Sequence, residues 1–122
     1  MPYLNDEAMD GGLDWIDTNG DKLHILSQEV STFGDCTTYS LGNKDGIAIA
    51  APSNRSPTGR EVVISAITDG SVTGTGTATH WAITDDSSVL IACEELASSQ
   101  GVTSGNTFTL TEFAIGYPDP TT

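Results

Sequence analysis

The sequence predicts a mainly β protein: an antiparallel β-sandwich of about seven or eight short strands, with a short N-terminal helix. Short runs rich in valine, isoleucine, threonine and aromatic residues recur along the chain, as is typical of strands. Glycine, proline, asparagine and aspartate separate these runs about every 8–12 residues. No regular alternation of strands with long amphipathic helices is visible, which disfavours an α/β fold. We therefore expect one domain over residues 1–122, with an N-terminal segment (1–20) and an extended C-terminal arm (117–122).

The N-terminal segment is predicted to form a helix over residues 5–16. Asn5 is a suitable N-cap, and acidic residues follow it in the positive first turn. Asn19-Gly20 is expected to end the helix with a left-handed residue. A hairpin around an Asn19-Gly20 turn is the alternative. Apolar residues recur on one face at helical spacing, and this favours the helix: Met9, Leu13 and Ile16.

The rest of the chain is predicted to be strands joined by turns. The run over residues 61–68 is the richest in β-branched residues and is expected to be a central strand buried on both faces. In residues 72–79, threonine alternates with glycine and alanine; we expect a flat strand that admits a neighbouring backbone and mediates self-association. Turns are expected at residues 42–46, 69–70, 85–88 and 104–106. The predicted strands cover residues 22–28, 39–41, 46–51, 61–68, 72–79 continuing into 81–83, 89–93 and 107–115.

The charge of the chain is strongly acidic. Seventeen acidic residues against four basic ones give a formal net charge of −13. Such a surface repels phosphate backbones, so nucleic acid is not an expected partner. No apolar run approaches the ~20 residues of a membrane span, and the N-terminus lacks the basic and apolar regions of a signal peptide. We therefore expect a chain made in the cytosol, with no membrane partner.

The loop over residues 53–60 is a candidate for contact with a partner. It combines Arg55 and Arg60 with Pro57, and proline lowers the entropy cost of ordering a loop at a contact. The expected neighbour is acidic, for example another copy of the chain. An ordinary surface connection is the alternative. Tyr117, at the start of the proline-rich tail, is a further candidate contact.

The two cysteines show no metal-binding spacing. Cys36 and Cys93 form no CxxC motif and the histidines have no ligand spacing, so no zinc site is expected. Cys36 lies in a polar, turn-like segment that suggests exposure, whereas Cys93 ends an apolar run. We expect a disulfide in an oxidising environment, between chains rather than within one, since nothing in the sequence brings the two residues together. Packing as reduced core residues is the alternative.

Catalytic and cofactor motifs are not recognisable. His80 lies in a predicted strand and no Gly-x-Ser-x-Gly elbow occurs. The acidic pairs at residues 85–86 and 94–95 are neighbours in sequence, so they do not converge on one atom. Residues 14–21 lack the spacing of a calcium loop, and residues 74–77 lack the lysine of a phosphate loop. We expect no enzyme activity, no cofactor and no metal.

Several segments together carry a family resemblance. They are Tyr-Ser-Leu-Gly-Asn-Lys at 39–44, Ala-Pro-x-x-Arg-Ser-Pro-x-Gly-Arg at 51–60, and Ala-Ile-Thr-Asp-Gly-Ser-Val-Thr-Gly-Thr-Gly-Thr-Ala-Thr-His-Trp-Ala at 66–82. Two more are Ala-Ser-Ser-Gln-x-Val-Thr-Ser-Gly-Asn-Thr-Phe-Thr-Leu-Thr at 97–111 and Ile-Gly-x-Pro-Asp-Pro at 115–120. The pattern covers nearly the whole chain from about Leu23. It resembles a family of short, mostly uncharacterised virion-associated proteins of tailed phages and prophages of alphaproteobacteria.

The resemblance implies a phage particle, a β-rich fold and no catalytic residues. Its pattern does not require cysteine at position 36 or 93. We therefore expect a structural virion protein that decorates or cements the capsid shell, through self-association (as in a trimer) and contacts to the major capsid protein. A neck, collar or tail protein is one alternative, and a receptor- or glycan-binding module of the particle is another.

Overall fold

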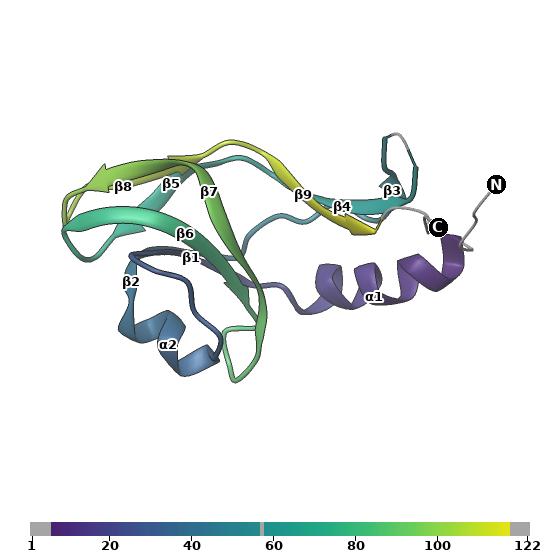
Figure 1. The fold of residues 1–122 in the computed structure, drawn as a ribbon, viewed down its shortest axis with the longest axis horizontal. Coiled ribbons are helices and arrows are strands. Elements are labelled where there is room, and N and C mark those ends of the chain that lie inside the picture. The colour runs from purple at the N-terminus through teal and green to yellow at the C-terminus, as the bar shows by residue number, and fades with distance from the viewer. Residues whose placement is uncertain (1–5, 57, 118–122) are drawn as a thin grey trace. The chain divides into compact units, whose positions relative to one another are not determined.

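The fold belongs to the predicted class. The computed structural model describes residues 6–56 and 58–117, with the backbone alone at residues 6–9 and 117. These residues form helix α1 (Asp6–Asn19), a second helix α2 (Phe33–Thr38) and nine strands in two antiparallel sheets, which confirms a mainly β chain with a short N-terminal helix (Figure 1). The chain divides into two compact units. Unit 1 comprises Met1–Asn19, Ala48–Ala66 and Thr111–Thr122; unit 2 comprises Gly20–Ile47 and Ile67–Leu110.

Unit 1 is built from α1 and a three-stranded sheet. The sheet has the order β3 (Ser53–Asn54), β4 (Arg60–Ile64), β9 (Phe113–Tyr117), and α1 lies against β4 and β9. Burial alternates along β4, as expected when one face packs and the other is exposed. Among the described side chains of this unit, the buried ones are Leu13, Val62 and Ile64.

Unit 2 contains a six-stranded antiparallel sheet. The strands are β1 (Lys22–Leu26), β2 (Ser40–Asp45), β5 (Ile67–Val72), β6 (Gly76–Thr84), β7 (Leu90–Val102) and β8 (Thr107–Leu110), in the order β7-β6-β1-β2-β5-β8. Figure 1 shows that β6 and β7 are strongly curved, so the sheet curls. Four of the five residues of β1 are buried, which places this strand in the core. The other large buried side chains of unit 2 include Ile67, Val72, Trp81, Ile83, Phe108 and Leu110.

The helix over the N-terminal segment is confirmed, and the alternative hairpin is wrong. α1 ends at Asn19, close to the predicted end, and the Asn19 Nδ2 donates to the Trp15 carbonyl at 2.8 Å. The predicted left-handed residue at this end is wrong, because the glycines with positive φ are Gly46, Gly59 and Gly105. The expected N-cap, Asn5, lies outside the described residues.

Two long predicted strands are in fact divided between the sheets. The run over residues 61–68 is interrupted at residues 65–66, since β4 belongs to the three-stranded sheet and β5 to the six-stranded one. The expectation of one strand buried on both faces is therefore wrong. The run over residues 107–115 is divided in the same way between β8 and β9.

Two predicted turns are strand. Residues 42–45 of the predicted turn at 42–46 lie within β2, and the turn predicted at Asp69-Gly70 lies within β5. Residues 46–51 form a single bridge, between Ile49 and Ile64, instead of a strand. The turns predicted at residues 85–88 and 104–106 are confirmed, the second with Gly105 at φ 92.

Candidate interaction surface

The outer edge of β7 is the main surface that the sheet leaves open. β7 is the last strand of the six-stranded sheet, and among the described residues it pairs with β6 alone. It is 13 residues long and none of these is buried, whereas β8, at the opposite edge, has four residues. An edge strand presents a row of N–H and C=O groups to which another chain can pair. The sequence predicted only the first part of this strand, at residues 89–93.

A bulge divides this edge. Ala78 of β6 pairs with Gln100, but His80 pairs with Glu95, so the four residues between them, 96–99, stand opposite Thr79 alone. Extra residues of this kind bend a strand and interrupt its pairing. Beyond the bulge, the Gln100 Nε2 donates to the Thr109 carbonyl of β8 at 3.1 Å. The open part of β7 is therefore residues 90–95, which we call the edge segment. A second register shift leaves Ile91 without a partner of its own in β6, so the regular part of the segment is residues 92–95.

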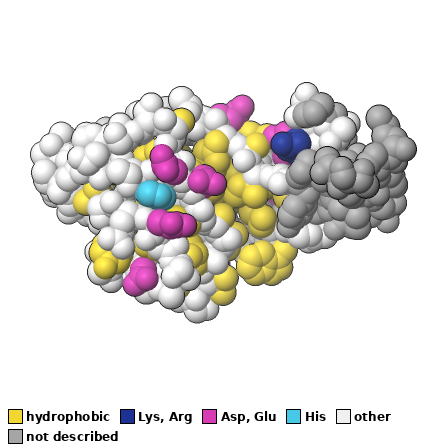
Figure 2. Space-filling view, viewed as in Figure 1, with side chains coloured by type: hydrophobic (Ala, Val, Ile, Leu, Met, Phe, Trp, Pro, Cys, Tyr) yellow, Lys and Arg dark blue, Asp and Glu magenta, His cyan; other side chains and the backbone are white. Residues whose placement is uncertain are grey.

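The edge segment contains a backbone donor held by its own strand. The N–H of Glu95 donates to the Glu94 carboxylate at 2.9 Å. The Thr84 carbonyl of β6 accepts a hydrogen bond from the Asp21 N–H, so Thr84 and, four residues earlier, His80 direct their backbone groups toward β1. Glu95, which pairs with His80, therefore directs its N–H away from β6, to the outer edge. Both glutamates are exposed, and Glu95 lies across from His80. Figure 2 shows acidic side chains gathered around a histidine on the displayed face.

The inner side of the edge segment is anchored by apolar contacts. A buried cluster of Leu26, Val30, Cys36 and Ala82 has Leu90 and Cys93 of β7 packed against it, together with Tyr39. The first residues of β7 are thus fixed to α2 and β1, while the glutamates that follow face solvent.

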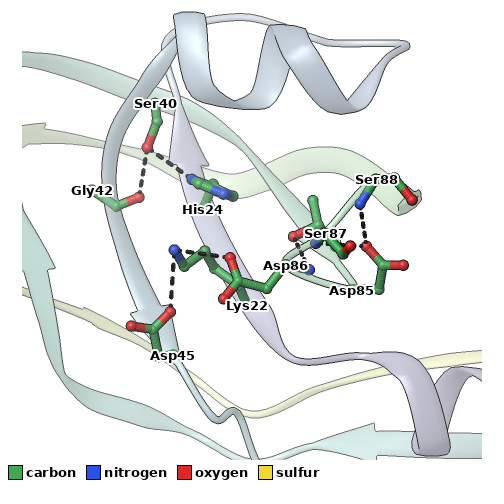
Figure 3. A network of polar contacts seen from close by, with 10 residues as sticks. Lys22, His24, Ser40, Gly42, Asp45, Asp85, Asp86, Ser87 and Ser88 are labelled. Carbon is green, nitrogen blue, oxygen red and sulfur yellow. Dashed lines mark hydrogen bonds and ion pairs between the residues drawn. The ribbon is translucent and has the colours of Figure 1, made fainter.

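The loop that leads into β7 is ordered by Asp85. Its Oδ1 accepts the backbone N–H groups of Ser87, Ser88 and Val89, each at 2.9 Å (Figure 3). These hydrogen bonds lower the pKa of Asp85 below its usual value, and the bond from Val89 has the largest effect. This carboxylate acts as a turn former, in agreement with the turn predicted here.

A lysine joins the same loop to β2. Lys22 Nζ lies 3.1 Å from Asp86 and 3.2 Å from Asp45 (Figure 3). The hydrogen bond to Asp86 is the main cause that raises the pKa of Lys22. Asp86 has φ 61, a left-handed conformation that aspartate tolerates better than most residues. Lys22 therefore joins the turn of the β6–β7 hairpin to β1 and β2.

The predicted docking loop uses Arg60 internally. Arg60 Nε and Nη2 donate to the two Asp10 carboxylate oxygens at 2.9 and 3.1 Å, and both side chains are mostly buried. Nη1 also donates to Asn54 at 2.8 Å. This bidentate pair joins α1 to β4, so the structure gives Arg60 a bracing role within unit 1.

The other predicted contact residues are placed as follows. Arg55 Nη1 donates to the Thr58 carbonyl at 3.1 Å within its own loop, and its side chain is half-buried. Pro57 lies outside the described residues. Tyr117 is the last residue of β9 and pairs with Arg60, so the predicted arm does not begin at this residue. The Arg55 side chain lies close to Gly116, the residue before Tyr117, since a Cβ at Gly116 would be 3.2 Å from the Arg55 Cδ.

The strand predicted to mediate self-association is internal to the sheet. The N–H groups of Thr73 and Gly74 donate to the Leu41 carbonyl at 2.9 and 3.1 Å, and Gly76–Ala78 of β6 pair with β7. Gly74 and Gly76 do lie close to Leu41, as expected for glycines that admit a neighbour. That neighbour belongs to the same chain, and self-association through residues 72–79 stays a prediction.

The hydrogen bonds of His24 and Ser40 were not anticipated from the sequence. His24 is 7% exposed, and its Nδ1 lies 3.0 Å from the Ser40 Oγ (Figure 3). The Ser40 hydroxyl donates its hydrogen to the Gly42 carbonyl at 3.0 Å, so the proton between the two side chains belongs to His24 Nδ1. This is the reverse of a base that activates a serine nucleophile. The pair therefore braces β1 against β2.

Stability is expected to fall below about pH 6.5 because of His24. Burial, helped by the charge of Lys22, lowers the pKa of His24 from its usual 6.5. As the pH falls, the unfolded chain therefore binds a proton at His24 before the folded chain does. The contribution of neutral His24 to stability is fully present above pH 6.5 and declines as the pH falls toward the folded-state pKa. The slope for one proton is at most about 1.4 kcal/mol per pH unit. Denaturant unfolding between pH 7.5 and 5 should show a flatter profile for His24→Gln; equal profiles would contradict this origin.

The expected exposure of Cys36 is wrong. Its segment forms α2, capped by the Thr32 Oγ, which accepts the Asp35 N–H at 3.1 Å. Cys36 is the buried residue of this short helix; it is 0% exposed and belongs to the cluster on which Cys93 packs. Both thiols are free, so the predicted disulfide is absent. A buried Cys36 is also unsuited to the intermolecular bond that we expected.

Thiol labelling should distinguish the two cysteines. Burial is the main cause that raises the pKa of Cys36 to about 11, so at pH 8 only about one part in a thousand is thiolate. We expect iodoacetamide to modify Cys93 first and Cys36 only after denaturation, as followed by mass spectrometry of peptides. Rapid modification of Cys36 in the folded protein would contradict its burial.

The described residues were also compared with the requirements of a metal site and of a membrane span, and the sequence and fold with known proteins. In the described residues no three His, Cys, Asp or Glu side chains are grouped so as to hold a metal ion, and Asp14 and Asp17 of the calcium-like sequence lie on α1. No helix in the described part has the length and apolar character needed to span a membrane. Searches with protein-family models, curated proteins and solved structures found no match. They leave the phage resemblance neither supported nor contradicted.

Proposed function

We propose that the chain is a non-catalytic structural protein of a tailed-phage particle, made in the host cytoplasm and bound to the capsid shell through the major capsid protein. The segments quoted above, from Tyr39 to Pro120, support the phage particle. The observation that carries a binding role is the long edge of β7, in which no residue is buried. The His24–Ser40 pair and the Lys22 network are used to join strands, which agrees with a structural role.

Particle composition tests this function. Particles purified from an induced lysogen that encodes the chain would be analysed by quantitative mass spectrometry. We expect the chain at a copy number on the order of hundreds, because a protein that covers a symmetric shell repeats with its subunits. About six or twelve copies would indicate the neck or tail instead. Absence from particles that contain the other virion proteins would contradict the proposal.

Contacts between copies of the chain are part of the same proposal. Light scattering on the purified protein, with and without particles that lack it, measures both self-association and attachment. A protein that stays monomeric and also fails to bind such particles would contradict a decorating role.

A further inference from the structure

We propose that the edge segment of β7, residues 90–95, binds an extended, positively charged segment of another protein as an additional strand. This deepens the proposed function and rests on it for the identity of the partner as a particle protein. The chemistry of binding follows from the edge segment alone and does not depend on the proposed function.

The backbone of the edge segment provides the first part of the site. Strand addition gains its affinity from main-chain hydrogen bonds along an open edge. In this chain the bulge at residues 96–99 and the link from Gln100 to β8 limit the open length to about one short strand. The apolar anchors Leu90 and Cys93 hold that length in place from the inner side. An incoming strand would therefore meet a preformed edge.

Glu94 and Glu95 provide the selectivity. The Glu94 carboxylate occupies the outward N–H of Glu95, so an incoming carbonyl must displace it. A lysine or arginine on the incoming strand offers the displaced carboxylate a new partner while its own backbone takes the N–H. An acidic strand would instead bring like charges together and leave the carboxylate without a partner.

A second copy of this chain is a poor occupant of the same edge. Three of its four basic side chains form ion pairs within the chain: Lys22 with Asp45 and Asp86, Lys44 with Asp69, and Arg60 with Asp10. The fourth, Arg55, donates to its own loop. Glu94 and Glu95 of this edge would also repel a second copy, whose net charge is −13. The charge of the edge segment therefore favours a basic protein other than this chain.

Synthetic peptides test the proposal on the full-length protein. The probe is a fluorescent peptide of about ten residues in which lysine alternates with threonine and valine, and the control peptide has glutamate at every lysine position. Fluorescence anisotropy measures binding. We expect the lysine peptide to bind, the glutamate peptide not to bind, and affinity to fall as salt is raised.

Three variants separate backbone pairing from charge. Glu95→Pro removes the outward N–H at a position where an edge strand tolerates proline, and it should abolish binding. Glu95→Gln keeps the N–H and loses one charge, so it should weaken binding by only about two- to fivefold. Glu94→Gln keeps the acceptor oxygen and should weaken binding similarly. Melting curves and circular dichroism establish that each variant is folded.

Three results would overturn the inference. Unchanged affinity in a folded Glu95→Pro variant would mean that the peptide binds by charge alone. If that variant is unfolded, a glutamate peptide that binds the unmodified protein as well as the lysine peptide does would overturn it instead. Self-association of the unmodified protein that is lost in Glu95→Pro would make a second copy the occupant. Because no particles are used, these results are independent of whether the chain is found in virions.

Discussion

Replacing Gly42 with alanine is expected to lower the free energy of unfolding by about 1–3 kcal/mol. A Cβ at this position would lie 2.5 Å from the Ser71 carbonyl oxygen and 3.2 Å from the Val72 Cα. Both atoms are backbone of β5, which pairs with β2 at this point, so the strands would have to separate. Glycine in a strand often marks such a close approach of another backbone. Urea denaturation measures the change.

Gly101→Ala is the matched control for this substitution. Gly101 is exposed on β7, a Cβ there would meet nothing within 4 Å, and its φ is not left-handed. Alanine at this position should be neutral or stabilise the protein by up to about 1 kcal/mol, because it restricts the unfolded chain. Equal losses in the two variants would contradict the register of β2 and β5.

Breaking the Arg60–Asp10 pair is expected to cost about 1.5–3 kcal/mol. Both side chains are largely buried, at 17% and 25% exposure, and two hydrogen bonds join them. Arg60→Met keeps the aliphatic stem of the side chain but leaves the Asp10 carboxylate without this cation. Asp10→Asn removes the opposite charge. Thermal or urea unfolding of the two single variants and the double variant gives the coupling energy, which should exceed about 1 kcal/mol.

Arg55→Ala is the control within the same loop. Arg55 makes one hydrogen bond to the Thr58 carbonyl, so its loss should change the free energy of unfolding by about 0.5 kcal/mol or less. A coupling energy near zero between Arg60 and Asp10 would show that the pair does not brace unit 1. It would also restore Arg60 as a candidate contact for a partner.

The fold class could be predicted because local signals agree with it. The apolar spacing of Met9, Leu13 and Ile16 gives α1, and the aspartates and serines at residues 85–88 give the hairpin turn. The division of residues 61–68 between two sheets could not be predicted, since apolar, β-branched residues stand on both sides of Ser65-Ala66 and only long-range pairing shows that the chain changes sheet there. Gly42 was assigned to a turn because a glycine needed for close backbone contact looks the same in sequence as a glycine needed for a turn.

The candidate surface was harder to predict than the fold. The strand predicted here ended at Cys93, because the polar residues that follow interrupt the apolar run. An edge strand without buried residues does not need such a run. The position of Arg60 depends on Asp10, 50 residues away in the chain, which no local pattern indicates. The capped helix α2 did have a signal, since Thr32 lies three residues before Asp35, as in a capping box.

Hydrogen exchange followed residue by residue with NMR is the most direct test that β7 keeps one edge open. β6 lies between two strands, so its amides from Trp81 to Ile83 should exchange slowly. β7 pairs on one side only, so the Glu95 amide, held only by an exposed side chain, should exchange much faster. Addition of the lysine peptide should slow its exchange. Protection of Glu95 equal to that of β6 in the free protein would mean that the edge is already covered, and would contradict the account.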